Sequence, residues 1–264
     1  MQDVGVLGAG IRPMQPVPGR LPVGAEWSYE VDWSGIRLLA DVEDGTLCLR
    51  TLEGDDVTAR FPEFAPLADV VPDGLFDGEA VLLDAGQPSS LALFDRLRRA
   101  DPRKARTLAR ARPAILMVYD VLRLYGVPLT ARPLDERRAT LGRLNLDEVG
   151  RIQVSPVYDD GPALLAGVRE QGLPGVMARR RDTPHDPDAE GDWLRVVAPA
   201  EAPTAPTAAT AVDLPTAEQP PAGPALSALP PKPPHPLSAS SVAPSGKVPR
   251  GRHSRGGEEP PGLW

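Results

Sequence analysis

The stretch YEVDWSGIR, Tyr29 to Arg37, decides the fold. Apolar residues cluster on both sides of Ser34-Gly35, a pair that is typical of a tight turn. We expect the flanking runs WSYEVDW and GIRLLADV to be two strands joined here as a hairpin. A second hairpin is predicted directly afterwards, because Asp44-Gly45 separates two apolar runs in VEDGTLCLR.

The rest of the chain predicts more strands than helices. The run AILMVYDVLRL, residues 114–124, is so strongly apolar that we expect it centrally in a sheet. A helix is predicted over Pro133–Leu144, where proline stands at the start and leucines recur on one face. The other expected elements are strands at 75–84, 175–180 and 193–197 and a helix at 163–171. Without regular strand and helix alternation, the pattern indicates an α+β fold.

Composition changes near Val197. From Ala198 to the end, proline, alanine, serine and glycine dominate, with 16 of the 33 prolines and Trp264 as the single aromatic residue. Such a segment buries too little apolar surface to offset chain entropy. We therefore expect a flexible entry at 1–12, one folded domain at 13–197 and a disordered tail at 198–264. We also expect no second folded domain of the small-barrel type after Val197, because this segment could not form the five strands that such a barrel needs.

Charge and cysteine content limit the partners and the cellular compartment that we expect for the protein. The net charge is −7, and acidic and basic residues balance at five each in the tail, which leaves 31 acidic and 24 basic residues in the folded part. A general polyanion binder would normally be basic. The single cysteine, Cys48, excludes a disulfide framework or a cysteine zinc site and suits a reducing compartment. Without an apolar run long enough for a membrane span, we expect a cytoplasmic protein with no membrane contact.

An arginine-rich segment runs from Leu91 to Pro113. It contains Arg96, Arg98, Arg99, Arg103, Lys104, Arg106, Arg110 and Arg112. One interpretation is a phosphate-contacting patch. The favoured interpretation is a solvated helical face whose long side chains cover apolar surface, because the domain is acidic and no aromatic residues interleave for base stacking.

Two other features of the sequence give weaker evidence of function. The N-terminal VGVLGAGIRP has Gly5, Gly8 and Gly10, but Pro13 interrupts the helix that a dinucleotide site needs, and no strand-helix-strand unit surrounds it. His185 has no second histidine in the folded part, so we expect a surface loop residue and not a base or ligand.

A series of motif blocks follows in order along the domain. They are Glu30–Arg37, Thr51–Gly54 with DVTARFPEF after it, Asp77-Gly78-Glu79, Tyr119–Leu122 with RPLDERRATL after it, Pro174–Arg179 and Trp193–Val197. Together they resemble the nucleotidyltransferase (adenylation) domain of ATP-dependent DNA ligases, especially the bacterial end-joining type. The resemblance covers residues 13–197 and implies two antiparallel sheets with flanking helices around a cleft.

The resemblance assigns roles to particular positions. Asp32 stands where the family has the nucleophilic lysine, and Ser34 replaces an aspartate. The implied nucleotide-binding residues are Glu30, Arg37, Glu79, Tyr119, Arg179 and Arg195. ATP is the implied cofactor, while Pro174 removes a carboxylate that the family places near magnesium, so no metal ligand is predicted. Each retained residue also has a structural alternative: an Arg37–Glu79 ion pair, core packing of Tyr119, and filling of the cleft by Trp33 and Trp193.

The change at Asp32 determines the functional expectation. A lysine amine can hold AMP as a phosphoramidate, whereas a carboxylate repels a triphosphate and is shorter. The only lysines are Lys104, Lys232 and Lys247, and two of these lie in the tail. We expect a ligase-family protein of DNA repair or recombination without self-adenylation, keeping at most adenine-nucleotide or weak DNA binding. The alternatives are an active ligase with another nucleophile, or an interaction protein that recruits partners through LPPKPPHP, residues 229–236.

Overall fold

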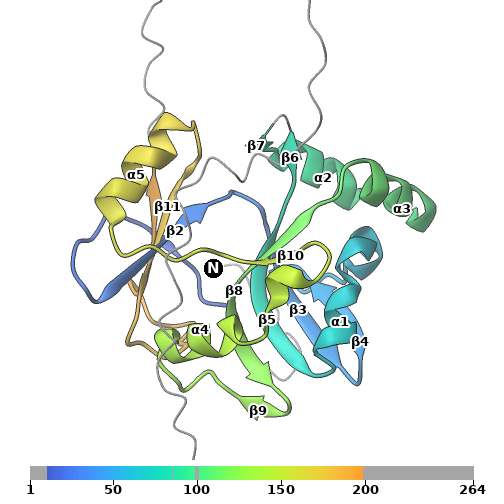
Figure 1. The fold of residues 1–264 in the computed structure, drawn as a ribbon, viewed down its shortest axis with the longest axis horizontal. Coiled ribbons are helices and arrows are strands. Elements are labelled where there is room, and N and C mark those ends of the chain that lie inside the picture. Colours follow the sequence, from blue (N-terminus) through green and yellow to red (C-terminus); the bar gives the residue numbers. More distant parts are fainter. Residues whose placement is uncertain (1–10, 85, 99–100, 199–264) are drawn as a thin grey trace, which may run out of the picture. The chain divides into compact units, whose positions relative to one another are not determined.

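The computed structural model describes residues 11–84, 86–98 and 101–198, all within one unit. The expected α+β class is confirmed, with strands outnumbering helices in these ranges (Figure 1). Of the predicted entry segment only Ile11 and Arg12 are described, and of the tail only Ala198, so the rest of both segments lies outside the described residues. Their predicted flexibility and disorder therefore stay predictions.

The larger sheet has the strand order β10-β8-β5-β3-β4, with β9 paired beside β8. Strand β8 is buried along almost its whole length, as its apolar run predicts. Neighbouring strands are antiparallel, except that β10 runs parallel to β8. The strands are β3 (Ile36–Glu43), β4 (Thr46–Arg50), β5 (Gly74–Val81), β8 (Ile115–Leu124), β9 (Val127–Pro128) and β10 (Ile152–Val154).

The smaller sheet has the order β1-β12-β11-β2. Strand β11 pairs antiparallel with both β2 and β12, and β1 runs parallel to β12 at the edge. The sheets thus differ from the expected purely antiparallel arrangement by one parallel pair each. Its strands are β1 (Val17–Pro18), β2 (Trp27–Asp32), β11 (Gly175–Arg180) and β12 (Trp193–Val197), and β6 (Leu83–Asp84) and β7 (Gln87–Pro88) form a separate ribbon.

Helices flank both sheets (Figure 1). Helix α5 packs on β11 and β2, α4 on β8, and α1 and α2 on β4 and β5. The α-helices are α1 (Pro66–Val70), α2 (Ser90–Arg98), α3 (Pro102–Ala111), α4 (Leu134–Gly142) and α5 (Gly161–Glu170), and the 3-10 turns are η2 (Thr58–Arg60), η3 (Pro62–Phe64) and η4 (Leu146–Glu148). Both helices predicted from the sequence are present, as α4 and α5. In the described ranges no helix combines the length and apolarity that crossing a membrane requires.

The expected hairpin at Ser34-Gly35 is wrong. Strand β2 pairs with β11 in the smaller sheet, whereas β3 pairs with β4 and β5 in the larger one. Ser34 has a φ of 46°, and a Cβ atom on Gly35 would lie 2.4 Å from the carbonyl oxygen of Ala80, so the chain turns sharply and passes from sheet to sheet. The second hairpin is confirmed, because Asp44 and Gly45 link β3 to β4 with φ of 48° and 71°.

Each sheet has its own core, and a third cluster joins them. Leu38, Phe61 and Phe64 belong to the core of the larger sheet, and Trp27 and Val176 to that between the smaller sheet and α5. The joining cluster contains Met14, Tyr119 from β8 and Trp193 from β12. Aromatic side chains from both sheets thus meet where the β2–β3 connection crosses.

Candidate functional site

A cavity of about 190 Å³ lies at this crossing. It is bounded by the end of β2, the starts of β3 and β12, and the facing side chains of β5, β8 and β11. Of the seven residues predicted to be catalytic or nucleotide-binding, six line it and the seventh, Glu30, binds one of them. The six are Asp32, Arg37, Glu79, Tyr119, Arg179 and Arg195.

Asp32, at the predicted nucleophile position, is held in an ion pair. Its Oδ2 accepts a hydrogen bond from Arg195 Nε at 2.5 Å, and its Oδ1 accepts one from the backbone N–H of Ser34 at 2.9 Å. Arg195 also donates through Nη2 to Ser34 Oγ at 2.7 Å. The Asp32 side chain is 7% exposed and that of Arg195 is 45% exposed. An arginine from the last strand therefore closes over the carboxylate that ends β2.

Arg37 does not form the expected ion pair with Glu79. The two residues are opposite each other across β3 and β5, but the guanidinium reaches along β5 to the fully buried Asp77. Arg37 Nε and Nη2 donate to Asp77 Oδ1 and Oδ2 at 2.9 and 2.5 Å, and Nη1 donates to the carbonyl of Met14. A fork of two hydrogen bonds suits the guanidinium better than one contact with the nearer acid.

Glu79 accepts a hydrogen bond from the backbone N–H of Gly35 at 2.9 Å. Burial raises the pKa of its carboxyl to about 7, and the nearby charge of Asp32 adds to the rise. The Gly35 N–H and the guanidiniums of Arg179 and Arg37 act in the opposite direction. Glu79 is thus a carboxyl that holds its proton up to near neutral pH.

Tyr119 is both packed and faced by cations. Its ring meets Trp193 edge-on, with 6.0 Å between ring centres, and its hydroxyl lies 3.4 Å from the carbonyl oxygen of Gly78. The Cζ atom of Arg179 lies 4.3 Å from the Tyr119 ring centre and 4.6 Å from that of Trp193. Arg37 lies farther away, at 5.6 Å from the Tyr119 ring centre. A guanidinium thus covers the ring of a residue that the resemblance assigns to nucleotide binding.

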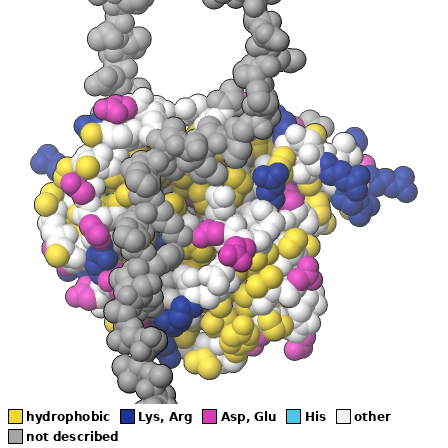
Figure 2. Space-filling model, viewed as in Figure 1, with side chains coloured by type: hydrophobic (Ala, Val, Ile, Leu, Met, Phe, Trp, Pro, Cys, Tyr) yellow, Lys and Arg dark blue, Asp and Glu magenta, His cyan; other side chains and the backbone are white. Residues whose placement is uncertain are grey.

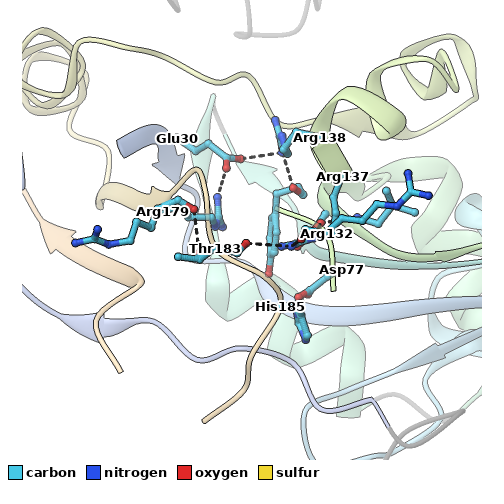
Figure 3. A network of polar contacts seen from close by, with 12 residues as sticks. Glu30, Asp77, Arg132, Arg137, Arg138, Arg179, Thr183 and His185 are labelled. Carbon is cyan, nitrogen blue, oxygen red and sulfur yellow. Dashed lines mark hydrogen bonds and ion pairs between the residues drawn. The ribbon is translucent and has the colours of Figure 1, made fainter. Parts of the chain in front are cut away.

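A buried network fixes Arg179 in this place (Figure 3). Glu30 forms ion pairs with Arg179 and, at 3.5 Å, with Arg138 of α4. Arg138 donates in turn to the carbonyl oxygens of Tyr119, at 2.6 Å, and of Ser155. Because Glu30 and Arg179 are both 3% exposed, this arrangement is part of the domain interior.

Behind this network lies an ion pair that the sequence analysis missed. Arg137 Nε and Nη2 donate to the two oxygens of Asp120 at 2.8 and 2.7 Å, and both side chains are 0% exposed. Arg137 also donates to the carbonyl oxygens of Arg132 and Thr183, at 2.6 and 3.3 Å. An aspartate in the middle of a strongly apolar run was the signal, since a buried carboxylate there requires a partner.

His185 is not the expected surface residue. It is 7% exposed, and its Nε2 lies 2.8 Å from the carbonyl oxygen of Arg12 (Figure 3). The position is still structural, because the ring connects the segment before β1 with the loop between β11 and β12. The ring nitrogen Nδ1 is buried and has no hydrogen-bond partner among the described residues, as is also true of the indole nitrogens of Trp33 and Trp193.

The cavity offers few free charges to a metal or a phosphate. Each arginine that lines it already has a carboxylate partner: Asp77 for Arg37, Glu30 for Arg179 and Asp32 for Arg195. Among residues 11–84, 86–98 and 101–198 there is no group of three or more His, Cys, Asp or Glu side chains that could hold a metal ion. The residues present therefore do not fit a magnesium ion.

The fold and the site define a nucleotidyltransferase-type adenylation domain, with two sheets around a cavity of acids, arginines and a tyrosine. The model of the family described as ATP dependent DNA ligase domain matches residues 21–196. This chain belongs to that family. The motif blocks noted in the sequence fall inside the matched range, except that the last block extends one residue beyond it, to Val197.

Relatives and solved structures agree with this assignment. The chain is 34% identical over 176 residues to the multifunctional non-homologous end joining DNA repair protein LigD of Mycobacterium tuberculosis. The aligned residues make up 65% of this chain and 21% of that protein. It is 36% identical over 178 residues to a probable DNA ligase of Streptomyces coelicolor, covering 64% and 34%. The chain thus spans about a fifth to a third of the length of these relatives.

The same fold occurs in solved ligase domains. The crystal structure of the ligase domain from M. tuberculosis LigD has a TM-score of 0.57 and 29% identity, over 70% of this chain and 58% of that one. A mycobacterial DNA ligase D complexed with ATP and MES has a TM-score of 0.58 and 29% identity, over 70% and 60%. The predicted adenylation-domain fold is therefore confirmed.

Proposed function

We propose that this domain is a ligase-family protein of DNA repair or recombination that does not adenylate itself. One observation carries the proposal: Asp32, at the position of the family's attacking amine, is a carboxylate that is already paired with Arg195 at 2.5 Å. A carboxylate 4 Å from a phosphate charge is repelled by about 4 kcal/mol at an effective dielectric of about 20. The same ion pair engages Arg195, one of the cations that the resemblance assigns to nucleotide binding.

No other amine supports self-adenylation in the described part of the chain. Lys104 is the one lysine there, and it is exposed on α3 and absent from the cavity lining. The rival function, an active ligase with another nucleophile, would require an acyl-adenylate on Asp32 or Glu79. Such an intermediate would first have to break the hydrogen bond of Asp32 to Arg195 or of Glu79 to Gly35.

Incubation with α-labelled ATP and magnesium tests the proposal. We expect no labelled protein on a denaturing gel, under conditions in which the M. tuberculosis LigD ligase domain is labelled as a positive control. A labelled band that disappears in Asp32→Asn would contradict the proposal and support the rival. Hydroxylamine would then distinguish an acyl-adenylate, which it cleaves readily, from a phosphoramidate.

Residual ligand binding is the second part of the proposal. Two observations support this part: the related mycobacterial structure is complexed with ATP, and Tyr119, Arg37 and Glu79 line the cavity here. We propose at most weak binding of an adenine nucleotide, because Arg179 covers the face of Tyr119. Weak DNA binding is proposed on the family membership, and a cytoplasmic location on the single cysteine.

Thermal unfolding with ATP and with adenosine separates nucleotide binding from a pure interaction role. A ligand at 100 times its dissociation constant adds about 2.7 kcal/mol of stability, which raises the melting temperature by several degrees. A shift with either compound at millimolar concentration would support retained binding. If neither compound gives a shift, the interaction protein becomes the better assignment, with residues 229–236 as its first candidate for partner binding.

A further inference from the structure

Helix α3 carries a group of exposed cations that the cavity does not use. Its N-terminal part and middle present Arg103, Lys104 and Arg106 to solvent, and its last turn presents Arg110. Figure 2 shows Lys and Arg side chains gathered over this helix at the edge of the molecule. We call Arg103, Lys104, Arg106 and Arg110 the α3 basic face.

This face is distinct from the structural arginine in the same segment. Arg96 of α2 is 2% exposed, forms an ion pair with Glu63 at 2.6 Å and lies 4.9 Å from the Phe61 ring centre. Its Nε also donates to the carbonyl of Arg60 at 2.8 Å. The favoured sequence interpretation thus divides between the two helices: Arg96 covers apolar surface, whereas the α3 basic face is a solvated helical face.

The four cations have no acidic partner in the described chain. Elsewhere in the same ranges arginines such as Arg123 and Arg181 are paired with two or more carboxylates. Next to the face, Arg112 pairs with Asp84 at 3.2 Å, and Asp101 accepts a hydrogen bond from the backbone N–H of Arg103 at 2.9 Å as the helix cap. The positive charge of the α3 basic face is thus left for solvent or a partner.

The arrangement is unfavourable for the helix itself. The first turn of α3 contains no acidic residue and two cations, Arg103 and Lys104, where the positive end of the helix dipole disfavours positive charge. Arg103 and Arg106 are also three residues apart, and Arg106 and Arg110 four, so like charges are neighbours on one stripe. A bound polyanion would offset both effects.

The spacing fits a nucleic acid backbone. At a rise of about 1.5 Å per residue, Arg103, Arg106 and Arg110 mark a line of about 10 Å, which corresponds to about three phosphate steps of one strand at about 3.4 Å of duplex axis each. We infer that the α3 basic face docks the phosphate backbone of duplex DNA, away from the cavity. This inference rests on the weak DNA binding proposed above and gives it a location. Because the folded part is acidic as a whole, the attraction is local.

Salt-dependent binding to a 20-base-pair labelled duplex tests the inference. The full chain is compared with a variant in which Arg103, Lys104, Arg106 and Arg110 are all changed to Gln, a good helix former. The matched control changes Arg20, Arg132, Arg151 and Arg169 to Gln, which removes the same charge from exposed arginines that form no ion pair in the described chain. Circular dichroism and melting confirm that each variant is folded.

We expect the wild type and the control to lose about a hundredfold in affinity between 50 and 200 mM salt, since four phosphate contacts give a slope near −3.6. The α3 variant should bind weakly with a slope near zero. Equal binding by both variants would overturn the α3 location while leaving DNA binding in place. Absence of binding by the wild type at 50 mM salt would overturn DNA binding itself, and the ATP labelling result would be unaffected.

A membrane surface is the other polyanion to test. Vesicles of phosphatidylserine and phosphatidylcholine in a 1:4 ratio are used in a flotation assay with the same three proteins. We expect no flotation of the wild type. Flotation that depends on the α3 basic face, with duplex binding that does not, would replace nucleic acid by an anionic lipid surface.

Discussion

Arg195 Nε lies 2.5 Å from Asp32 Oδ2, so this ion pair connects β12 to the end of β2 beside the cavity. Strand β11 already separates β12 from β2 by hydrogen bonding to both. The ion pair therefore adds little to the sheet and acts mainly on the cavity. It neutralises a carboxylate and an arginine that would otherwise both face a ligand.

Removing this ion pair should change stability only slightly. In a double-mutant cycle with Asp32→Asn and Arg195→Gln, we expect a coupling free energy below about 1 kcal/mol, because Arg195 is 45% exposed and solvent screens the pair. Urea unfolding of the four proteins measures it. A coupling of about 3 kcal/mol or more would indicate a desolvated pair that supports the fold.

Restoring the family residues at two positions should not restore ligation. The double variant Asp32→Lys with Ser34→Asp brings back the amine and the acid of the first block. We expect no sealing of a nicked duplex, because Pro174 still replaces the carboxylate that the family places near magnesium. The assay follows a labelled nick, with an intact ligase as control. Sealing by the double variant would show that these other changes are tolerated.

Glu79 should make stability depend on pH. Its pKa is about 7 in the folded protein against 4.5 ordinarily, so the folded state holds an extra proton between these values. Stability is therefore highest below about pH 4.5 for this group and falls as pH rises through 7, by at most about 3 kcal/mol. Glu79→Gln should be more stable than the wild type at pH 8 and lose this part of the dependence. Exposed Glu53→Gln is the control and should leave the profile unchanged.

The Arg137–Asp120 pair should be costly to break from one side. Asp120→Asn leaves the fully buried Arg137 without a charged partner, and we expect the free energy of unfolding to fall by about 3–5 kcal/mol. Denaturant unfolding measures the loss. The control is Asp135→Asn. The Asp135 side chain is 54% exposed and lies 3.5 Å from Arg181, so this change should alter the free energy of unfolding by less than about 1 kcal/mol. Similar losses in both variants would contradict the assignment of a buried, desolvated pair.

Replacing Gly78 or Gly167 by alanine should change stability in opposite directions. A Cβ atom on Gly78 of β5 would lie 2.5 Å from the carbonyl oxygen of Met117, so Gly78→Ala should force the β5 and β8 strands apart and cost about 1–3 kcal/mol. Gly167 of α5 has nothing within 4 Å of such an atom. Gly167→Ala should stabilise the helix by about 0.5–1 kcal/mol. Melting temperatures that change in the same direction would contradict this reading of the two environments.

Local sequence patterns predicted most elements because they depend on nearby residues. The bounds of β11 and β12 are those expected, and the Asp44-Gly45 turn is present. The partners of β2 and β3 could not be predicted in the same way, since six consecutive buried residues in β2 fit any partner strand. A turn signal such as Ser34-Gly35 specifies a sharp reversal but not which strands pair on either side of it.

The sequence predicted which residues line the candidate cavity, but it did not predict their contacts with one another. The motif blocks identified six residues that line the cavity and Glu30 behind it. That Arg37 binds Asp77 and not Glu79 depends on the reach of a long side chain between residues two apart on one strand. Arg138 and Arg137 were missed because their importance comes from α4 lying against β8, a contact between segments without a local signature.

Lysine is so scarce here that its chemistry becomes a mapping tool. Among the described residues, amine-reactive reagents have a single side-chain target, Lys104, which is exposed on α3. A fluorophore attached through an activated ester would therefore report on that helix, apart from label on the N-terminus and on Lys232 and Lys247. Peptide mapping after proteolysis separates these sites, so labelling in the presence and absence of a duplex would give a footprint at one defined position.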